Sequence, residues 1–145
     1  MKVTVMDNSR KYHSALQFAT LRGLEAIGLT AERHAKRKLT REVYTGKKPY
    51  KLTGRLRNSV TYAVSGQRAN IQSYSGDHGE PGGTYSGRAP KDKNMAVYIG
   101  TNVEYAIGIE IGTHRKAGGV HFLQDAAQNH SEEYKQLIKE SMQAY

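Results

Sequence analysis

A long apolar stripe near the start of the chain constrains the fold more than any other feature of the sequence. Between residues 9 and 41, apolar side chains recur at intervals of three to five positions, at Leu16, Ala19, Leu24, Ile27, Ala31, Ala35 and Leu39. This spacing places them on one side of an α-helix. Gly23 and Gly28 interrupt the stripe, each at a cost of about 1 kcal/mol relative to Ala, and allow a bend or close packing. The pattern predicts one long helix over residues 9–41.

The positive charge of the chain is concentrated at the end of this helix and just beyond it. The 145 residues carry 22 Lys+Arg and 13 Asp+Glu, a net charge of +9. Residues 33–57 contain ten basic residues and one acidic residue, so this segment alone carries 10 − 1 = +9. We name as the basic patch its residues Arg33, Lys36, Arg37, Arg41, Lys47, Lys48 and Lys51. It is either a solvated helix face or a surface that contacts DNA or an acidic protein partner.

Composition excludes several classes of protein. The chain has no cysteine, so it has no disulfide framework and no thiolate zinc site. No apolar run reaches the roughly 18 residues of a membrane span, and the first residues lack the apolar stretch of a secretory signal. We therefore expect a protein made in the cytoplasm, with no membrane partner. A hydrophobic content of 37% with 15 glycines predicts extended loops or surface that is buried only against a partner.

The middle of the chain is predicted to form strands. Gly46, Pro49 and Gly54 end the helix, and alternation predicts strands over residues 60–64, 69–73 and 95–100, the first two as a hairpin. Between the second and third of these strands, residues 75–94 form a Gly-rich insertion longer than the ~12–15 residues usual for a structureless loop. It is either mobile or an extended hairpin ordered by a partner. Tyr74 and Tyr85 would supply its binding surface.

The C-terminal part of the chain is predicted to be mostly helical. Residues 105–113 fit a strand or a short helix equally well, because periodicity alone does not separate the two. The spacing of apolar residues predicts a final amphipathic helix over residues 123–144. Its buried side would contain Ala126, Ala127, Tyr134, Leu137, Ile138 and Met142. The expected fold is a single α+β domain over residues 1–145.

Catalytic signals are sparse. Glu110 and His114 are four residues apart and would share one face of a helix, and with His121 or Asp125 they would surround a divalent metal. No recognised metalloprotease, phosphate-loop or nucleophile motif is present, and the six histidines are irregularly spaced. The other interpretation makes Glu110 a buried or interface carboxylate paired with Arg55 or Arg57. We expect no cofactor.

Three segments, taken in order, resemble a known family. They are LTGRLRNSV at residues 52–60, IGTNVEYAIGIEIGT at residues 99–113 and HFLQDA at residues 121–126. The set is similar to the head–tail joining, or tail-completion, proteins of long-tailed bacteriophages, whose pattern is TGxLRxS, VGTNVEYAxxxExGT and pFLrpA. His121 replaces the usual proline, Gln124 replaces the usual arginine, and residues 75–94 are an insertion.

The resemblance implies an antiparallel sheet packed by the long N-terminal helix and the C-terminal helix. It implies no enzymatic activity. Copies would form a ring, a hexamer, in the neck of the virion or at the head-proximal end of the tail, with double-stranded DNA in its lumen and no sequence specificity. The partners would be a head-completion or connector protein on one side and a tail terminator or tail tube protein on the other. Before assembly the protein would lie in the host cytoplasm.

The resemblance also implies structural roles for the motif residues. Gly54, Gly100 and Gly112 would form turns, Tyr105, Ile109 and Phe122 would be core, and Arg55 and Glu110 would position strand against helix. The remaining motif residues expected to hold the framework are Leu56, Ser59, Thr113 and Leu123. Two alternatives remain open: a basic nucleic-acid-binding module without sequence specificity, and a metal-dependent hydrolase or nuclease that uses Glu110 and His114.

Overall fold

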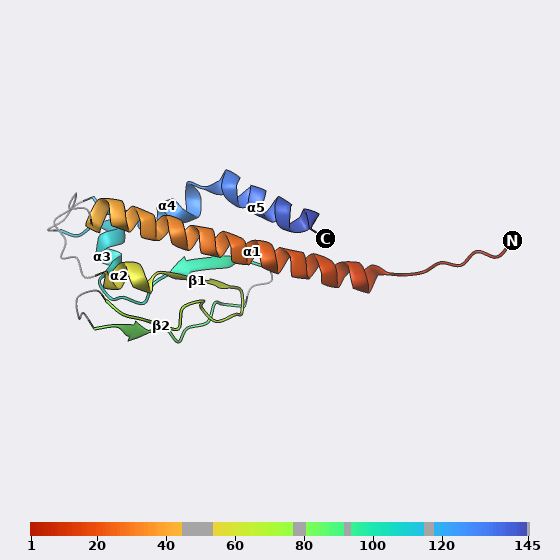
Figure 1. Ribbon diagram of the computed structural model, residues 1–145, viewed down its shortest axis with the longest axis horizontal. Coiled ribbons are helices and arrows are strands. Elements are labelled where there is room, and N and C mark those ends of the chain that lie inside the picture. Colours follow the sequence, from red (N-terminus) through yellow and green to blue (C-terminus); the bar gives the residue numbers. More distant parts are fainter. Residues whose placement is uncertain (45–53, 77–80, 92–93, 115–117, 145) are drawn as a thin grey trace.

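The computed structural model describes residues 1–44, 54–76, 81–91, 94–114 and 118–144. The molecule is elongated and has an α+β architecture. Its longest helix, α1 (Ser9–Leu39), runs along most of the long axis, and residues 1–8 project beyond it (Figure 1). In this view α4 and α5 lie on one side of α1, and the strands lie on the other.

The predicted N-terminal helix is confirmed. Its buried residues follow the apolar stripe from Ala19 to Leu39. Leu16, which was expected to start the stripe, is 56% exposed, so the buried face begins one turn later than predicted. Beyond Leu39 the chain widens into a π-helical turn, η1 (Thr40–Tyr44), in which Val43 is buried.

A small antiparallel sheet packs against the middle of α1. It consists of β1 (Thr61–Val64) and β4 (Val97–Gly100), paired with Thr61 opposite Gly100 and Val64 opposite Val97. The ring of Tyr62 lies directly over Gly28 of α1, where a Cβ atom would overlap it. The glycine that weakens helix propensity therefore allows the sheet to approach the helix closely, which confirms one of the two predicted uses of Gly28.

The prediction that residues 69–73 form a hairpin strand with β1 is wrong. The chain does run back beside β1, and the Asn70 N–H donates to the Tyr62 carbonyl at 2.9 Å. The strand that forms, however, is β2 (Ser73–Tyr74), and it pairs with β3 (Gly83–Thr84). Alternation identified an extended segment here, but it carries no information on which segment becomes the partner.

The described part of the 75–94 insertion folds back on the same chain. The Tyr85 N–H donates to the Gln72 carbonyl at 2.8 Å, and the Ala89 N–H donates to the Gln67 carbonyl at 2.9 Å. The described residues 83–84 pair with residues 73–74 as a hairpin would, and the ordering of the insertion by a partner stays a prediction.

Two short helices occupy the motif segments. The first motif segment forms α2 (Arg55–Ser59), which is preceded by Gly54 at φ 74° and leads directly into the strand predicted from residue 60. Residues 105–113 contain α3 (Ala106–Ile111), and Gly112 ends it at φ 87°. Gly100 was expected in a turn of this kind. It lies instead at the end of β4 without a positive φ.

The predicted C-terminal helix is broken into two. The first part is α4 (Phe122–Gln128), the second is α5 (Ser131–Gln143), and Asn129 and His130 between them have non-helical backbone angles. The Asn129 side-chain amide donates to the Asp125 carboxylate at 2.6 Å, so the residue at the break is tied back to α4. The break lets α4 enter the core through Phe122 and Ala126 while α5 turns along α1.

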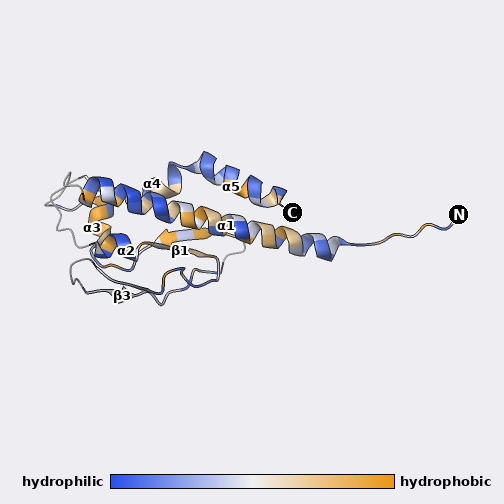
Figure 2. Ribbon diagram, in the orientation of Figure 1, coloured by the Kyte–Doolittle hydropathy of each residue, from blue (hydrophilic) through white to orange (hydrophobic). Residues whose placement is uncertain are grey.

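The main core lies where α1, α2, α3 and α4 meet. Its most completely buried side chains include Phe122, Leu39, Leu56 and Val60. A smaller cluster of Leu24, Ile27 and Val64 lies further along α1 under α5. Figure 2 shows the apolar colour on α3 and on the β4 strand beside α1, two of the elements that contribute to these clusters.

Candidate functional site

The second and third motif segments are joined by the carboxylate of Glu110. Its Oε2 accepts the backbone N–H of Leu123 at 2.9 Å, and its Oε1 accepts the backbone N–H of Gln124 at 2.9 Å. Both donors belong to the first turn of α4, where backbone N–H groups have no partner inside the helix. A carboxylate is also favoured there by the helix dipole. Glu110 is therefore a capping residue supplied from α3, and its carboxylate is occupied.

The backbone around this cap has an unusual geometry. His121, the residue before α4, has φ 54° and ψ 42°, and it is the one non-glycine residue with positive φ in the described part of the chain. The His121 N–H donates to the Glu110 carbonyl at 3.0 Å, and the Val120 N–H donates to the Ile109 carbonyl at 2.7 Å. These bonds hold the segment before α4 against α3.

The first and second motif segments are joined by Arg55 and Ser59. Arg55 Nη1 donates to Glu104 Oε1 at 3.1 Å, and its guanidinium lies 5.9 Å from the centre of the Tyr105 ring. The Ser59 hydroxyl lies 2.5 Å from that of Thr101. A backbone hydrogen bond within Glu104, with the Arg55 bond added to it, lowers the pKa of the Glu104 carboxyl. The hydrogen bond to Glu104 raises the pKa of Arg55.

Core positions in the motif segments are mostly where they were expected. Ile109 and Phe122 are buried, Leu56 is buried and Leu123 is half-buried. Tyr105 is the exception: it is 39% exposed, because its ring lies at the surface beside the Arg55 guanidinium instead of in the core. Thr113 is exposed. We call the arrangement of the three contacting segments the motif junction; it comprises residues 54–59, 100–113 and 121–126.

Four of the seven residues of the basic patch lie in the described part of the chain. Arg33, Arg37 and Arg41 are exposed at one-turn intervals along α1 and η1. Lys36 donates instead to the buried carboxylate of Glu32 at 2.7 Å. Lys47, Lys48 and Lys51 lie outside the described residues. Within the described residues, the exposed part of the basic patch is therefore a row of three arginines.

The two tyrosines assigned to a partner surface are partly used inside the chain. The Tyr74 hydroxyl donates to Asn102 Oδ1 at 2.9 Å, and its ring packs against the main core. Tyr85 packs against a small cluster of Ala63, Ala69 and Ala89. Both rings remain half-exposed, so their proposed contact with a partner is limited to the outer part of each ring.

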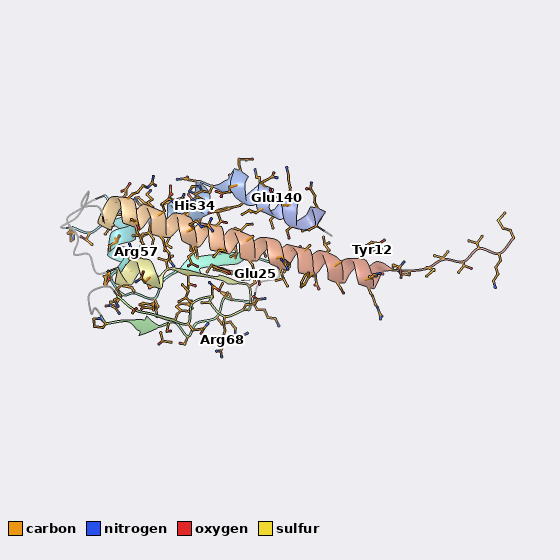
Figure 3. All side chains as sticks on the ribbon, viewed as in Figure 1. Tyr12, Glu25, His34, Arg57, Arg68 and Glu140 are labelled. Carbon is orange, nitrogen blue, oxygen red and sulfur yellow. The ribbon has the colours of Figure 1, made fainter. Side chains whose placement is uncertain are left out.

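Two groups of apolar side chains lie exposed at opposite ends of the molecule (Figures 1 and 3). We call the first the arm surface; it lies on residues 1–18. We call the second the α3 surface; it consists of Ile107 and Ile111, which are 68% and 63% exposed. The exposed apolar side chains of the arm surface are Met1, Val3, Val5, Met6, Tyr12, Leu16 and Phe18.

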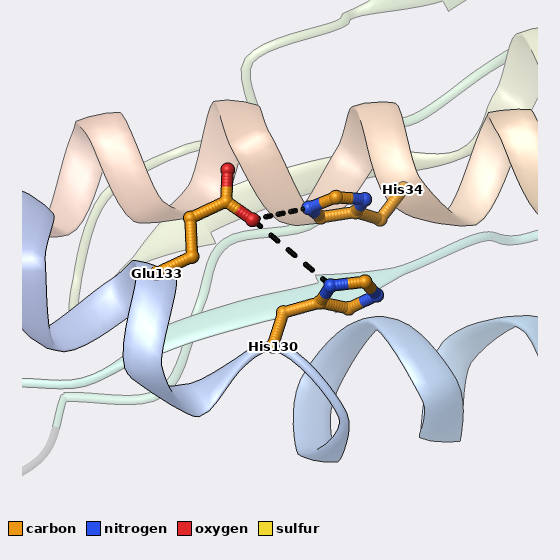
Figure 4. A group of neighbouring side chains, drawn as sticks. All are labelled: His34, His130 and Glu133. Atoms are coloured by element: carbon orange, nitrogen blue, oxygen red, sulfur yellow. Dashed lines mark hydrogen bonds and ion pairs between the residues drawn. The ribbon is translucent and has the colours of Figure 1, made fainter.

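The structure does not place Glu110 and His114 as the hydrolase interpretation requires. Because α3 ends at Ile111, Glu110 and His114 do not share a helix face, and His114 is exposed beyond Gly112. The His-containing cluster in the described residues is a different one, formed by His34, His130 and Glu133 (Figure 4). The sequence analysis missed it because 99 residues separate His34 from Glu133. The spacing of His130 and Glu133, three apart at a helix start, was the one local signal.

Comparison of the chain with protein-family models, with curated proteins and with solved structures finds no match. No helix among the described residues has the length and apolar character needed to cross a membrane.

Proposed function

We propose that the chain is a structural protein of a long-tailed bacteriophage virion that forms a ring at the head–tail junction, through which the genome passes. The observation that carries the proposal is the motif junction. The three segments that resemble the family are far apart in the sequence, yet Arg55 contacts Glu104 and Tyr105, and Glu110 caps the helix that begins at Phe122. If the resemblance is correct, the three motif segments should contact one another in the folded chain, and in the motif junction they do.

The exposed apolar surfaces support ring formation. The arm surface and the α3 surface differ in sequence and lie at opposite ends of an elongated molecule. A contact between two different surfaces of successive copies is heterologous, and it closes into a ring when the rotation between copies is suitable. The surface that each copy leaves in water would then be covered by its neighbour.

The row of Arg33, Arg37 and Arg41 gives the ring a charged surface that is repeated around its axis. In the lumen it would attract the DNA backbone without reading its sequence. On an axial face it would bind an acidic neighbouring protein. In the proposed hexamer those neighbours are a head-completion or connector protein and a tail terminator or tail tube protein. The role is structural, without catalysis or a cofactor, in the virion and, before assembly, in the host cytoplasm.

The test is complementation of a phage that lacks the gene. Without the protein we expect DNA-filled heads and separate tails under the electron microscope. The double variant Ile107→Asp/Ile111→Asp should remain folded and fail to restore joined particles. Leu29→Asp is the matched control, because Leu29 is an exposed apolar residue of α1 that belongs to neither surface. Normal particles in the absence of the gene would contradict the proposal.

A second candidate is a basic nucleic-acid-binding module without sequence specificity, and the spacing of the exposed arginines favours it. This module would bind double-stranded DNA as a monomer and would be dispensable for joining heads to tails. The same deletion experiment therefore separates the two functions.

A further inference from the structure

His34, His130 and Glu133 bring three potential metal-ligating atoms together between α1 and the start of α5 (Figure 4). His34 Nε2 lies 2.8 Å from Glu133 Oε2, and His130 Nδ1 lies 4.0 Å from the same oxygen. The two imidazole rings stack with their centres 3.6 Å apart and an 8° angle between their planes. All three ligand atoms lie within 4.8 Å of one another.

The donor set selects a class of ion. Two imidazole nitrogens and one carboxylate oxygen suit Zn²⁺ and its neighbours Co²⁺ and Ni²⁺, whereas Mg²⁺ and Ca²⁺ prefer oxygen ligands alone. Bonds of about 2.0–2.2 Å place tetrahedral ligand atoms roughly 3.3–3.6 Å apart, which lies between the 2.8 Å and 4.0 Å that separate the two imidazole nitrogens from Glu133 Oε2. The nearly parallel rings must open slightly so that both lone pairs point at one ion. His130 lies in the non-helical junction between α4 and α5, where its ring can turn without breaking a helix.

The groups behind His130 fit the same role. Its other ring nitrogen, Nε2, faces Asp125 Oδ2 at 3.6 Å. A carboxylate in that place orients a metal-binding imidazole and fixes its tautomer. Asp125 is itself held by the Asn129 amide at 2.6 Å and lies 3.6 Å from Lys38 Nζ.

We propose that His34, His130 and Glu133 form a binding site for a divalent transition metal of the Zn²⁺ class, which fastens α5 to α1. The metal would have structural value because none of the residues of α5 is fully buried. Its packing on α1 rests on the half-buried Leu137 and Ile138, and on the Ser141 hydroxyl, which donates to the Ala19 carbonyl. A bound ion would add a link at the other end of this contact. The site is independent of the head–tail joining function.

The test uses the full chain without a histidine tag, freed of metal by a chelator. Titration calorimetry with ZnCl₂ should give one bound ion per chain, and Zn²⁺ should raise the thermal midpoint where MgCl₂ does not. His34→Ala and His130→Ala should each weaken Zn²⁺ binding by more than about tenfold, and Asp125→Asn by about tenfold. Glu133→Gln keeps the size of an exposed side chain and removes its charge. It should weaken binding while leaving the fold unchanged by circular dichroism.

His13→Ala is the matched control, because His13 is an exposed histidine in the first turns of α1, outside the cluster. It should bind Zn²⁺ as the wild type does. In addition, the imidazole NMR signals of His34 and His130 should shift on titration, and those of His13 should not. The proposal is overturned if the wild type binds no Zn²⁺, or if His34→Ala and Glu133→Gln both bind it with wild-type affinity.

Discussion

The Oε2 atom of Glu110 lies 2.9 Å from the backbone nitrogen of Leu123 and accepts its hydrogen. Glu110 is in the last turn of α3 and Leu123 is in the first turn of α4, so one side chain fixes the relative position of two helices. The Gln124 N–H adds a second bond to the same carboxylate. The first turn of α4 thus takes its cap from another helix instead of from the residue before it.

Removing this cap should destabilise the protein. Glu110→Ala leaves two helix N–H groups without their acceptor and should lower the free energy of unfolding by about 1–2 kcal/mol. Glu110→Gln retains one carbonyl acceptor, so its stability should fall between those of the wild type and Glu110→Ala. Urea unfolding followed by circular dichroism measures the change. Glu132→Ala, at an exposed carboxylate paired with Lys135, is the control and should cost less than about 1 kcal/mol.

Gly28→Ala should be harmful even though alanine is the better helix former. The new Cβ would overlap the Tyr62 ring and lie 2.9 Å from Val97 Cγ2. Overpacking of this kind costs about 1–3 kcal/mol, more than the roughly 1 kcal/mol gained in helix propensity. Gly100→Ala is the matched control, because nothing lies within 4 Å of its Cβ position. Equal thermal midpoints for the two variants would argue against the close contact between α1 and the sheet.

The ionised Asp125 should contribute to stability above acidic pH. Its pKa in the folded protein is lowered from 3.8, so the unfolded chain binds the proton more tightly. The contribution is therefore complete above the unfolded value and is lost as the pH falls through the folded value. Urea unfolding of the wild type and of Asp125→Asn between pH 7 and pH 3 should show a difference that shrinks below about pH 4. A difference that stays constant over this range would assign the effect of the substitution to packing.

Ionisation of Tyr134 should lower the stability of the protein at alkaline pH. Burial, with smaller contributions from Glu133 and Asp125, raises the pKa of its hydroxyl to about 12. Since an unfolded tyrosine ionises near pH 10, the stability that depends on Tyr134 should fall as the pH rises above 10. The other tyrosines are common to both proteins, so the wild type compared with Tyr134→Phe isolates this residue. Below pH 10 the difference between them should be constant, because the hydroxyl keeps its bond to the Ala126 carbonyl.

The exposed arginines should bind DNA in a salt-dependent way if they face it. Arg33→Gln/Arg37→Gln should weaken binding to double-stranded DNA of any sequence and reduce the slope of log K against log salt by about 2, one unit for each phosphate that is no longer neutralised. Fluorescence anisotropy at several salt concentrations measures both quantities. Lys135→Gln/Lys139→Gln removes the same charge from α5 and should have little effect. Wild-type binding by the arginine variant would show that the row does not contact DNA, and would leave a protein partner or a solvated helix face as its role.

The sequence allowed the elements with local signals to be predicted. The helix over residues 9–41 was found because its apolar period is repeated many times, and the extended character of residues 60–64 and 95–100 was found by alternation. The pairing of these strands with one another was not predicted. Strand partners and register depend on tertiary contacts, so nothing in residues 69–73 indicated that β4 would take the place beside β1.

The features of the candidate site also separate into those with a local sequence signal and those that depend on tertiary contacts. Glu110 was predicted to pair with Arg55 or Arg57 and to position strand against helix. Instead it accepts two backbone N–H groups of α4 and positions α3 against α4, and Arg55 pairs with Glu104. These partners could not be predicted, because they depend on how α3 and α4 pack. The break at residues 129–130 had a signal that was overlooked: Glu132 and Glu133 are acidic residues in the first turn of a new helix. The meeting of His34 with His130 has no local signal at all.

The arrangement of the core has a consequence for how the protein is made. The inner face of α1 is covered by α4 and α5, and α4 begins about 80 residues after α1 ends. At about 5–20 residues per second, the ribosome needs roughly 4–16 s after completing α1 before it reaches the first residue of α4. During that time an unfinished chain presents a stripe made largely of alanine and glycine rather than leucine, flanked by arginine and lysine. A nascent chain with this composition is poorly suited to aggregate on the polysome.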